Sequence, residues 1–138
     1  MITMSCDIYA REFLPTYEVV YVDDGDGDRI TDEQRLALDE AGLEIKLHDA
    51  MPDVLLWDRE QDALWVIEAV TSDGEVDNQK VRAMEEFCER HKKTSIGFTT
   101  TYLDWKSFGR RQSAVKNLAE ETYVWVAEDA GKQLLVNT

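Results

Sequence analysis

MPDVLLWDREQDALWVIEAVTSDGEVD, residues 51–77 of this chain, contains two apolar segments joined by a short polar link. Side chains along a β-strand point alternately to its two faces, so each segment places one carboxylate among large apolar groups. Asp53 shares its face with Leu55 and Trp57, and Glu68 shares its face with Leu64, Val66 and Val70. The Arg-Glu-Gln-Asp link, 59–62, suits a tight hairpin that sets the strands side by side. The two carboxylates are therefore expected to converge.

A carboxylate among apolar side chains needs a compensating partner. Desolvating an unpaired carboxylate costs roughly several kcal/mol, so Glu68 is expected to meet a cation, a hydrogen-bond network or the sheet edge. Together with Asp53 it predicts a divalent-metal site. Two structural alternatives remain open: Asp53 caps a turn at the start of its strand, and Glu68 is an edge-strand charge paired with Arg or Lys.

Length and charge limit the class of protein. At 138 residues the chain, 1–138, is most simply one domain. Its 15 basic and 29 acidic residues give a net charge of -14, which opposes binding to another polyanion at low ionic strength. From Lys80 to Lys116, however, basic residues outnumber acidic ones by nine to four, which predicts a cationic face on an acidic body. A high-salt cytoplasm would also favour an acidic surface.

The sequence has no membrane or secretion signal. No apolar stretch approaches the roughly 20 residues of a membrane span, and no cationic region followed by an apolar run opens the chain. Cys6 and Cys88 lie far apart without CxxC spacing, which suggests neither a disulfide nor a zinc site. His48 and His91 have no cysteine or serine partner at an informative spacing and receive no catalytic role. A soluble cytoplasmic protein is expected.

The rest of the chain predicts alternating strands and helices. Thr31 and Gln34 have the spacing of a capping box, and Gly42 supplies a C-terminal stop. The helix between them, 32–41, is expected to turn Leu36, Leu38 and Ala41 inward. Further helices are expected at 5–13, 77–91 and 103–118, and strands at 18–22, 53–58, 63–70, 95–101, 123–127 and 134–136. This order predicts an α/β (α+β) fold with a mixed central β-sheet flanked by helices on both faces.

Five stretches, in this order and spacing, resemble the BsuBI/PstI family of type II restriction endonucleases, specifically its C-terminal catalytic domain. They are EVVYVDDGDGD (18–28), MPDVLLWD (51–58), LWVIEAVTSDGEVD (64–77), SIGFTTTYLDWKSF (95–108) and ETYVWVAED (121–129). The resemblance covers nearly the whole chain and implies the PD-(D/E)XK nuclease fold. It also implies Mg²⁺-dependent hydrolysis of double-stranded DNA, with Mn²⁺ able to substitute.

The resemblance gives the two carboxylates catalytic roles. Asp53 matches the Asp of the PD half-motif, and Glu68 matches the acidic residue of the second half-motif. Mg²⁺ prefers oxygen ligands and keeps several waters, so Asp53, Glu68 and the Ala69 carbonyl would suffice to bind it. Symmetric cutting of DNA suggests a homodimer, by analogy.

Three features depart from the family pattern. Val70 stands where the general nuclease motif has Lys, as it does in the family, so Lys80 is the candidate to orient the attacking water. Asp49 and Ala50 stand where the family tends to have Gly-Lys. The family's enzymes also have an N-terminal region implicated in DNA binding, and this chain starts almost at the catalytic domain. It is expected to be an excised piece or a shorter relative.

Several polar residues are candidate DNA contacts. Thr71 and Ser72 follow the strand of Glu68 and could contact a phosphate, although Ser72 or Asp77 could instead cap the next helix. Four cations of the predicted helix 103–118 could neutralise phosphates or form an ordinary solvated surface: Lys106, Arg110, Arg111 and Lys116. The four tryptophans are expected to pack in the core.

Two other functions compete with the nuclease hypothesis. A catalytically inactive relative would keep the nuclease fold as a binding or assembly module. This alternative is suggested by Val70, Ala50 and the excess of negative charge. An acidic decoy that imitates DNA would bind basic proteins and ignore metal.

Overall fold

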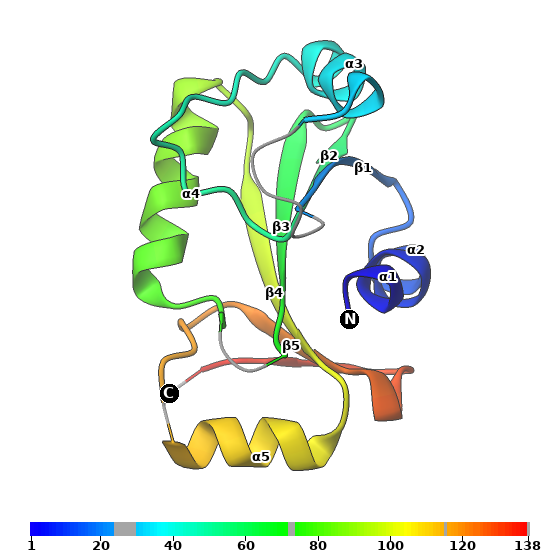
Figure 1. The fold of residues 1–138 in the computed structure, drawn as a ribbon, viewed down its shortest axis with the longest axis vertical. Coiled ribbons are helices and arrows are strands. Elements are labelled where there is room, and N and C mark those ends of the chain that lie inside the picture. Colours follow the sequence, from blue (N-terminus) through cyan, green and yellow to red (C-terminus); the bar gives the residue numbers. More distant parts are fainter. Residues whose placement is uncertain (24–29, 72–73, 115, 138) are drawn as a thin grey trace.

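The computed structural model describes residues 1–23, 30–71, 74–114 and 116–137 of the chain (Figure 1). Its sheet has six strands in sequence order. The strands are β1 (Tyr17–Val22), β2 (Val54–Asp58), β3 (Ala63–Ala69), β4 (Ile96–Tyr102), β5 (Tyr123–Val126) and β6 (Gln133–Leu135). β3, β4 and β5 run parallel, and the other neighbours are antiparallel. The predicted mixed sheet is therefore confirmed.

Helices cover both faces of this sheet, as predicted (Figure 1). The N-terminal helical segment comprises α1 (Ile2–Met4), the π-helix η1 (Ser5–Ala10) and α2 (Arg11–Phe13), and lies on one face. On the other face lie α3 (Asp32–Ala41) and α4 (Asn78–Arg90). α5 (Trp105–Ala114) follows β4, and a short 3₁₀ turn, η2 (Ala127–Asp129), follows β5.

Strand alternation divides the core in two. Facing α3 and α4, the sheet buries Leu55, Trp57, Leu64 and Val66 against Leu38, Met84 and Phe87. Facing the N-terminal helical segment, it buries Val54, Leu56 and Ile67 against Tyr9, Ala10 and Leu14. The apolar neighbours predicted for Asp53 and Glu68 therefore share one face, the side of α3 and α4.

Polar contacts within the core fix the N-terminal helical segment. The Tyr9 hydroxyl is fully buried and lies 2.7 Å from Thr99 Oγ1, and it also donates to Gln133 Oε1 at 2.7 Å. Ser5 Oγ lies 2.8 Å from Thr101 Oγ1. These contacts with β4 and β6 determine where residues 1–3 lie.

The helix ends agree with the sequence patterns, with some exceptions. The capping box between Thr31 and Gln34 is present, and Gly42 ends α3 with φ +72°. Leu36 was wrongly expected to face inward, because it is 70% exposed. It precedes buried Leu38 by two residues, which places it about 200° around the helix. The first helix starts at Ile2 rather than at residue 5.

The predicted helix 103–118 is also shorter than expected. α5 ends at Ala114, and Val115 lies outside the described residues. Downstream, the Ala119 N–H donates to the Val76 carbonyl at 2.9 Å, so the chain returns to pack beside the start of α4.

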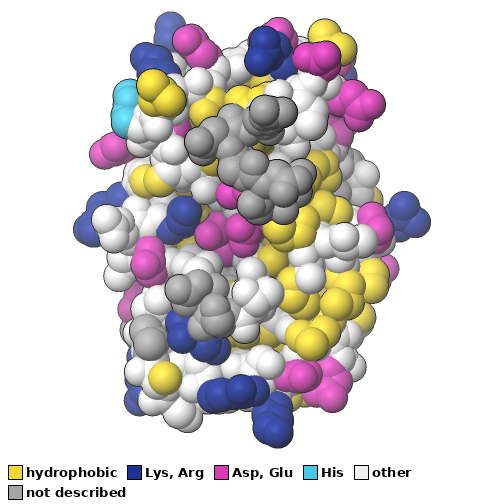
Figure 2. Space-filling model, in the orientation of Figure 1, with side chains coloured by type: hydrophobic (Ala, Val, Ile, Leu, Met, Phe, Trp, Pro, Cys, Tyr) yellow, Lys and Arg dark blue, Asp and Glu magenta, His cyan; other side chains and the backbone are white. Residues whose placement is uncertain are grey.

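The surface of the fold is strongly charged. In the orientation of Figure 1, acidic side chains gather near the middle of the face, and Lys and Arg side chains lie over α5 (Figure 2). No helix in the described parts of the chain combines the length and apolar character needed to cross a membrane.

The turn between β2 and β3 is built by its aspartates. Asp58 Oδ1 accepts hydrogen bonds from the N–H groups of Glu60 (3.0 Å) and Gln61 (3.3 Å). Its other oxygen accepts one from Thr16 Oγ1 at 2.8 Å. The expected tight hairpin forms over 59–62, and its turn fixes the register of the two strands.

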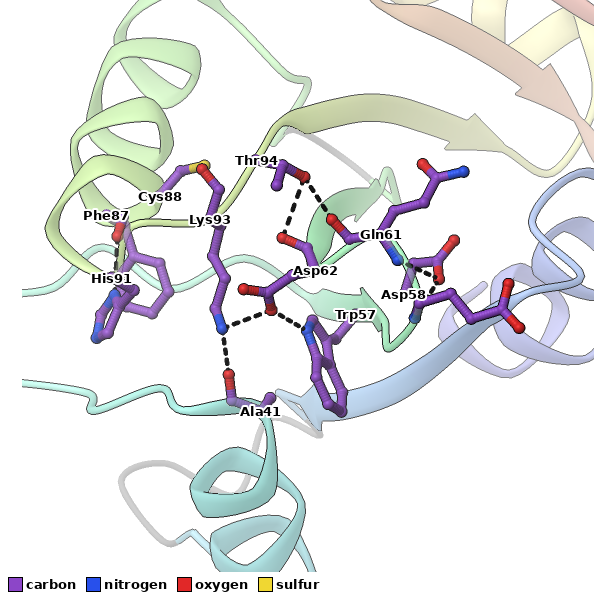
Figure 3. Close-up of polar contacts among 11 residues, drawn as sticks. Ala41, Trp57, Asp58, Gln61, Asp62, Phe87, Cys88, His91, Lys93 and Thr94 are labelled. Carbon is purple, nitrogen blue, oxygen red and sulfur yellow. Dashed lines mark hydrogen bonds and ion pairs between the residues drawn. The ribbon is translucent and has the colours of Figure 1, made fainter.

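A buried lysine joins this turn to two helices (Figure 3). Asp62 Oδ1 accepts hydrogen bonds from Trp57 Nε1 (2.7 Å) and Lys93 Nζ (2.8 Å). The Lys93 ammonium also donates to the Ala41 carbonyl at the end of α3. Since Lys93 follows α4 and its side chain is only 6% exposed, one ammonium fixes the hairpin against both helix ends.

Candidate metal site and nucleic-acid interface

The start of β2 and the end of β3 meet at the candidate site. The register pairs Val54 with Ile67, so Asp53 faces Glu68 one step further. The Asp53 N–H donates to Glu68 Oε1 at 2.8 Å. In return, Asp53 Oδ2 accepts a hydrogen bond from the Ala69 N–H at 2.8 Å. Each side chain thus binds the backbone of the opposite strand, which brings the two predicted metal ligands together.

Pro52 affects the backbone pairing of the Ala69 carbonyl. Continued by one more step, the register sets Pro52 opposite Ala69. Proline has no N–H and cannot donate a ladder bond to the Ala69 carbonyl. The Ala69 carbonyl, which is the third predicted ligand, lies beside Asp53 and receives no backbone hydrogen bond from Pro52.

The two carboxyl groups are electrostatically unfavourable together. The Glu68 side chain is only 8% exposed. Burial raises the pKa of Glu68 to about 7; the Lys80 ammonium opposes this rise and the Asp53 charge adds to it. Burial likewise raises the pKa of Asp53. The site therefore favours a proton or another cation.

An open cavity of about 560 Å³ lies beside Asp53. Its lining includes Asp23, Ala69, Thr71 and the N-terminal residues Met1–Thr3. Asp23 donates its N–H to the Asp53 carbonyl at 2.8 Å, and its charge also raises the pKa of Asp53. Asp23 was not predicted from the sequence as a site residue. An acidic residue immediately after a strand that pairs with β2 was the available signal.

Lys80 approaches the carboxylates from the first turn of α4. Asp77 caps that helix by accepting the Lys80 N–H at 2.8 Å, so Asp77 performs the capping considered for Asp77 or Ser72. Lys80 Nζ lies 3.7 Å from Glu68 Oε2. This distance allows an ion pair but exceeds a direct hydrogen bond. Glu68 is not an edge-strand charge, because β3 lies between β2 and β4.

Val70, at the motif position of the lysine, belongs to the core. It is 4% exposed and packs in a cluster with Tyr102, Val124 and Val126. A lysine ammonium at this position would have to leave that apolar cluster to reach the carboxylates.

Arg111 contacts a buried carboxylate. Its Nε and Nη2 donate to the Glu75 oxygens at 2.8 and 2.7 Å, and the Glu75 side chain is completely buried. Burial acts to raise the pKa of Glu75, but the hydrogen bonds and charge of Arg111, together with hydrogen bonds from a backbone N–H and Tyr102, lower the pKa. Removing one partner of such a pair typically costs about 3–5 kcal/mol. The guanidinium predicted to bind DNA is thus engaged inside the protein.

The other predicted DNA contacts are differently placed. Lys106 and Arg110 are exposed on α5, and Lys116 is exposed in the segment that follows it. Thr71 lines the cavity, whereas Ser72 lies outside the described residues.

Asp49 is part of an ion pair where the family tends to have glycine. Its two oxygens accept from Arg90 Nη1 (2.8 Å) and Nη2 (2.7 Å). These bonds lower the pKa of Asp49 to about 2. Arg90 also donates to the Glu44 carbonyl, so α4 holds the segment that leads to Pro52.

The donor set matches a hard divalent cation with few protein ligands. Within the described ranges, no three His, Cys, Asp or Glu side chains are clustered closely enough to hold a metal ion. Mg²⁺ requires fewer, because it is commonly bound by one or two carboxylates and retains waters. Asp53, Glu68 and the Ala69 carbonyl supply that number of oxygens beside an open cavity.

Comparisons with known proteins identify the family of the chain. The type II restriction enzyme BsuBI of Bacillus subtilis is 30% identical over 123 residues, which are 87% of this chain and 36% of that protein. The structure of SdaI restriction endonuclease matches with a TM-score of 0.79 and 25% identity, over 99% of this chain and 42% of that one. The chain thus spans about two fifths of the length of these relatives. The BsuBI/PstI restriction endonuclease domain model matches residues 2–138, and the chain therefore belongs to this family.

Proposed function

We propose that this chain is the catalytic domain of a Mg²⁺-dependent endonuclease that hydrolyses phosphodiester bonds in double-stranded DNA. The observation that carries the proposal is the pair of carboxylates, half-buried Asp53 and buried Glu68, each of which accepts a hydrogen bond from the backbone of the other strand; Asp53 also lines an open cavity. Family membership supports the same activity. Mn²⁺ would be able to replace Mg²⁺, because both accept carboxylate, carbonyl and water oxygens.

Asp53, Glu68 and the Ala69 carbonyl would hold the metal. When bound, Mg²⁺ supplies charge neutralisation at the phosphate and a lower pKa for a coordinated water. Asp53 and Glu68 must be ionised to serve as ligands, which requires Glu68 to lose the proton that its burial favours. The hydrogen bonds from the backbone fix the two carboxylates in advance.

Lys80 would position the attacking water. Its ammonium lies 3.7 Å from Glu68 Oε2, and its side chain is 20% exposed. From there it would hydrogen-bond the water and stabilise the charge that develops on the phosphoryl oxygens. Water would attack phosphorus and give up a proton to solvent, the bond to the leaving 3′ oxygen would break, and that oxygen would take up a proton from solvent.

Exposed cations on and after α5 would contact the DNA backbone. Lys106, Arg110 and Lys116 lie in a locally basic region of an acidic protein, and Thr71 lies at the cavity. These groups would neutralise or hydrogen-bond phosphates without reading sequence. A homodimer would present two such sites to the two strands of a symmetric target.

A catalytically inactive binding or assembly module is the second candidate. The observation that favours it is Val70, which fills the motif position of the lysine with a buried apolar side chain. Metal-dependent cleavage of plasmid DNA would exclude it, and absence of metal binding at any salt concentration would support it.

Replacing either carboxylate is expected to abolish metal binding and cleavage. Replacing a group that only orients a metal ligand typically lowers metal affinity or activity by about 10–100-fold. Asp53 and Glu68 are the proposed ligands themselves, so Glu68→Ala and Asp53→Asn should each lower Mg²⁺ affinity and plasmid nicking by at least about 100-fold. Calorimetry with Mg²⁺ or Mn²⁺ and a nicking assay across a salt series measure both effects. The exposed Glu89→Gln serves as the control. Cleavage retained in Glu68→Ala would contradict the proposal.

The metal-free protein is expected to become less stable between about pH 4.5 and 7. Glu68 keeps its proton to about pH 7 in the folded protein, whereas an ordinary Glu loses it near 4.5. In this window the folded state binds more protons, so stability falls as pH rises, in total by on the order of 3 kcal/mol. Urea unfolding of the protein and of Glu68→Gln at pH 5 and 8 measures this. The free energy of unfolding of Glu68→Gln should not show this fall with pH. An identical pH dependence in both proteins would contradict the raised pKa of Glu68.

Lys80→Met is expected to slow cleavage while preserving metal binding. Removing one group that stabilises transition-state charge typically costs about 100- to 1,000-fold in rate. Single-turnover rates at saturating Mg²⁺ measure the loss, and calorimetry tests whether Mg²⁺ still binds. Arg82→Met, which changes an exposed cation on the same helix, should cleave at the normal rate. An unchanged rate in Lys80→Met would remove Lys80 from the mechanism.

Each of the two exposed cations on α5, Lys106 and Arg110, is expected to contribute to the salt dependence of DNA binding. In Lys106→Gln or Arg110→Gln, the slope of log affinity against log salt should become shallower by about 0.9, because one fewer counterion is released. Binding titrations between low and moderate salt measure the slope. Lys132, which pairs with Asp129 at 3.1 Å, provides the control variant Lys132→Gln. Slopes equal to that of the unmodified protein would place the DNA elsewhere.

A further inference from the structure

One completely buried charge has no role in the chemistry proposed above. Glu75 lies between β3, which carries Glu68, and α4, which carries Lys80. Its carboxylate is held by both ends of the Arg111 fork and by the Tyr102 hydroxyl, which donates at 3.2 Å. A buried carboxylate persists only when its oxygens are satisfied in this way. The ion pair therefore fixes one point of the segment between β3 and α4 to α5.

The two residues after Glu75 extend this fixed point to the start of α4. The Val76 N–H donates to Thr100 Oγ1 on β4 at 3.1 Å in a buried contact. The Asp77 carboxylate then accepts the Lys80 N–H at 2.8 Å. Glu75 and Val76 are thus bonded to α5 and to β4, and Asp77, which follows them, caps α4 through the backbone of Lys80.

We propose that Glu75 and Arg111 are positioning residues for Lys80, because their ion pair joins α5 to the segment that leads into α4. The inference rests on the proposed function, in which Lys80 assists hydrolysis. Lys80 Nζ stands 3.7 Å from Glu68, beyond hydrogen-bond length, so its place depends on where the helix begins.

The geometry of the pair requires arginine. Nε and Nη2 of Arg111 bind the two Glu75 oxygens at 2.8 and 2.7 Å, a planar two-point contact that a lysine ammonium cannot reproduce. The adjacent cation, Arg110, is exposed and is a proposed phosphate contact. Of these two neighbouring residues on α5, Arg110 is therefore available for a phosphate, whereas Arg111 binds Glu75 just before α4.

A double-mutant cycle tests whether Arg111 acts through Lys80. Arg111→Lys is expected to lower the single-turnover cleavage rate about 10-fold, at saturating DNA and Mg²⁺ and well below its melting temperature. In a Lys80→Met background the same change should have no further effect, since the group it positions is gone. Equal reductions in both backgrounds would overturn the proposal. Arg35→Gln, an exposed change on α3, should leave both rates unaltered.

Amide hydrogen exchange gives a second measurement that needs neither DNA nor metal. In Arg111→Lys the N–H groups of Lys80 and Val81 should exchange faster than in the unmodified protein, and in Arg35→Gln they should not. Unchanged exchange in the folded variant contradicts the link. Glu75→Gln, which keeps the side-chain shape, replaces Arg111→Lys if the latter does not fold. If the unmodified protein fails to cleave DNA, the proposed function fails, and exchange alone then decides whether the pair holds the start of α4.

Discussion

Two hydrogen bonds from backbone N–H groups to carboxylates hold the acidic site together. One joins the Asp53 N–H to Glu68, and the other joins the Ala69 N–H to Asp53. Bonds of this charge-assisted kind are worth about 1.5–3 kcal/mol each. They replace the ladder that Pro52 ends, so the carboxylates are anchored by the strands themselves rather than by flexible loops. The relative position of Asp53, Glu68 and Ala69 depends on these two bonds.

The same contact explains why the site needs a positive charge. Backbone donors orient the carboxylates, but the single charge of Lys80, 3.7 Å from Glu68, does not balance two carboxylates, and Asp23 adds further negative charge nearby. Protonation of Glu68 is one solution, and a divalent cation is the other. An arrangement that only stabilised the fold would be better served by arginine at hydrogen-bond distance, as the pairs of Asp49 and Glu75 are.

Sequence patterns predicted the features that depend on neighbouring residues. The capping box of α3, the hairpin over 59–62 and the face shared by Asp53 and Glu68 all follow from short-range periodicity. Ion pairs between distant residues were not predictable in this way. Arg111 and Glu75 are 36 residues apart, and Arg90 and Asp49 are 41 apart, so no spacing rule connects them. Arg111 therefore resembled a surface cation in the sequence, although tertiary packing buries its partner.

The hairpin turn imposes a strict constraint on the number of residues between Asp53 and Glu68. Its aspartates and Lys93 fix the register at one end of β2 and β3, and the carboxylates meet at the other end. Because side chains alternate along a strand, inserting or deleting one residue there would rotate Glu68 to the opposite face of the sheet. Homologues that retain the acidic pair are thus expected to conserve the length of this link, even where its surface residues diverge freely.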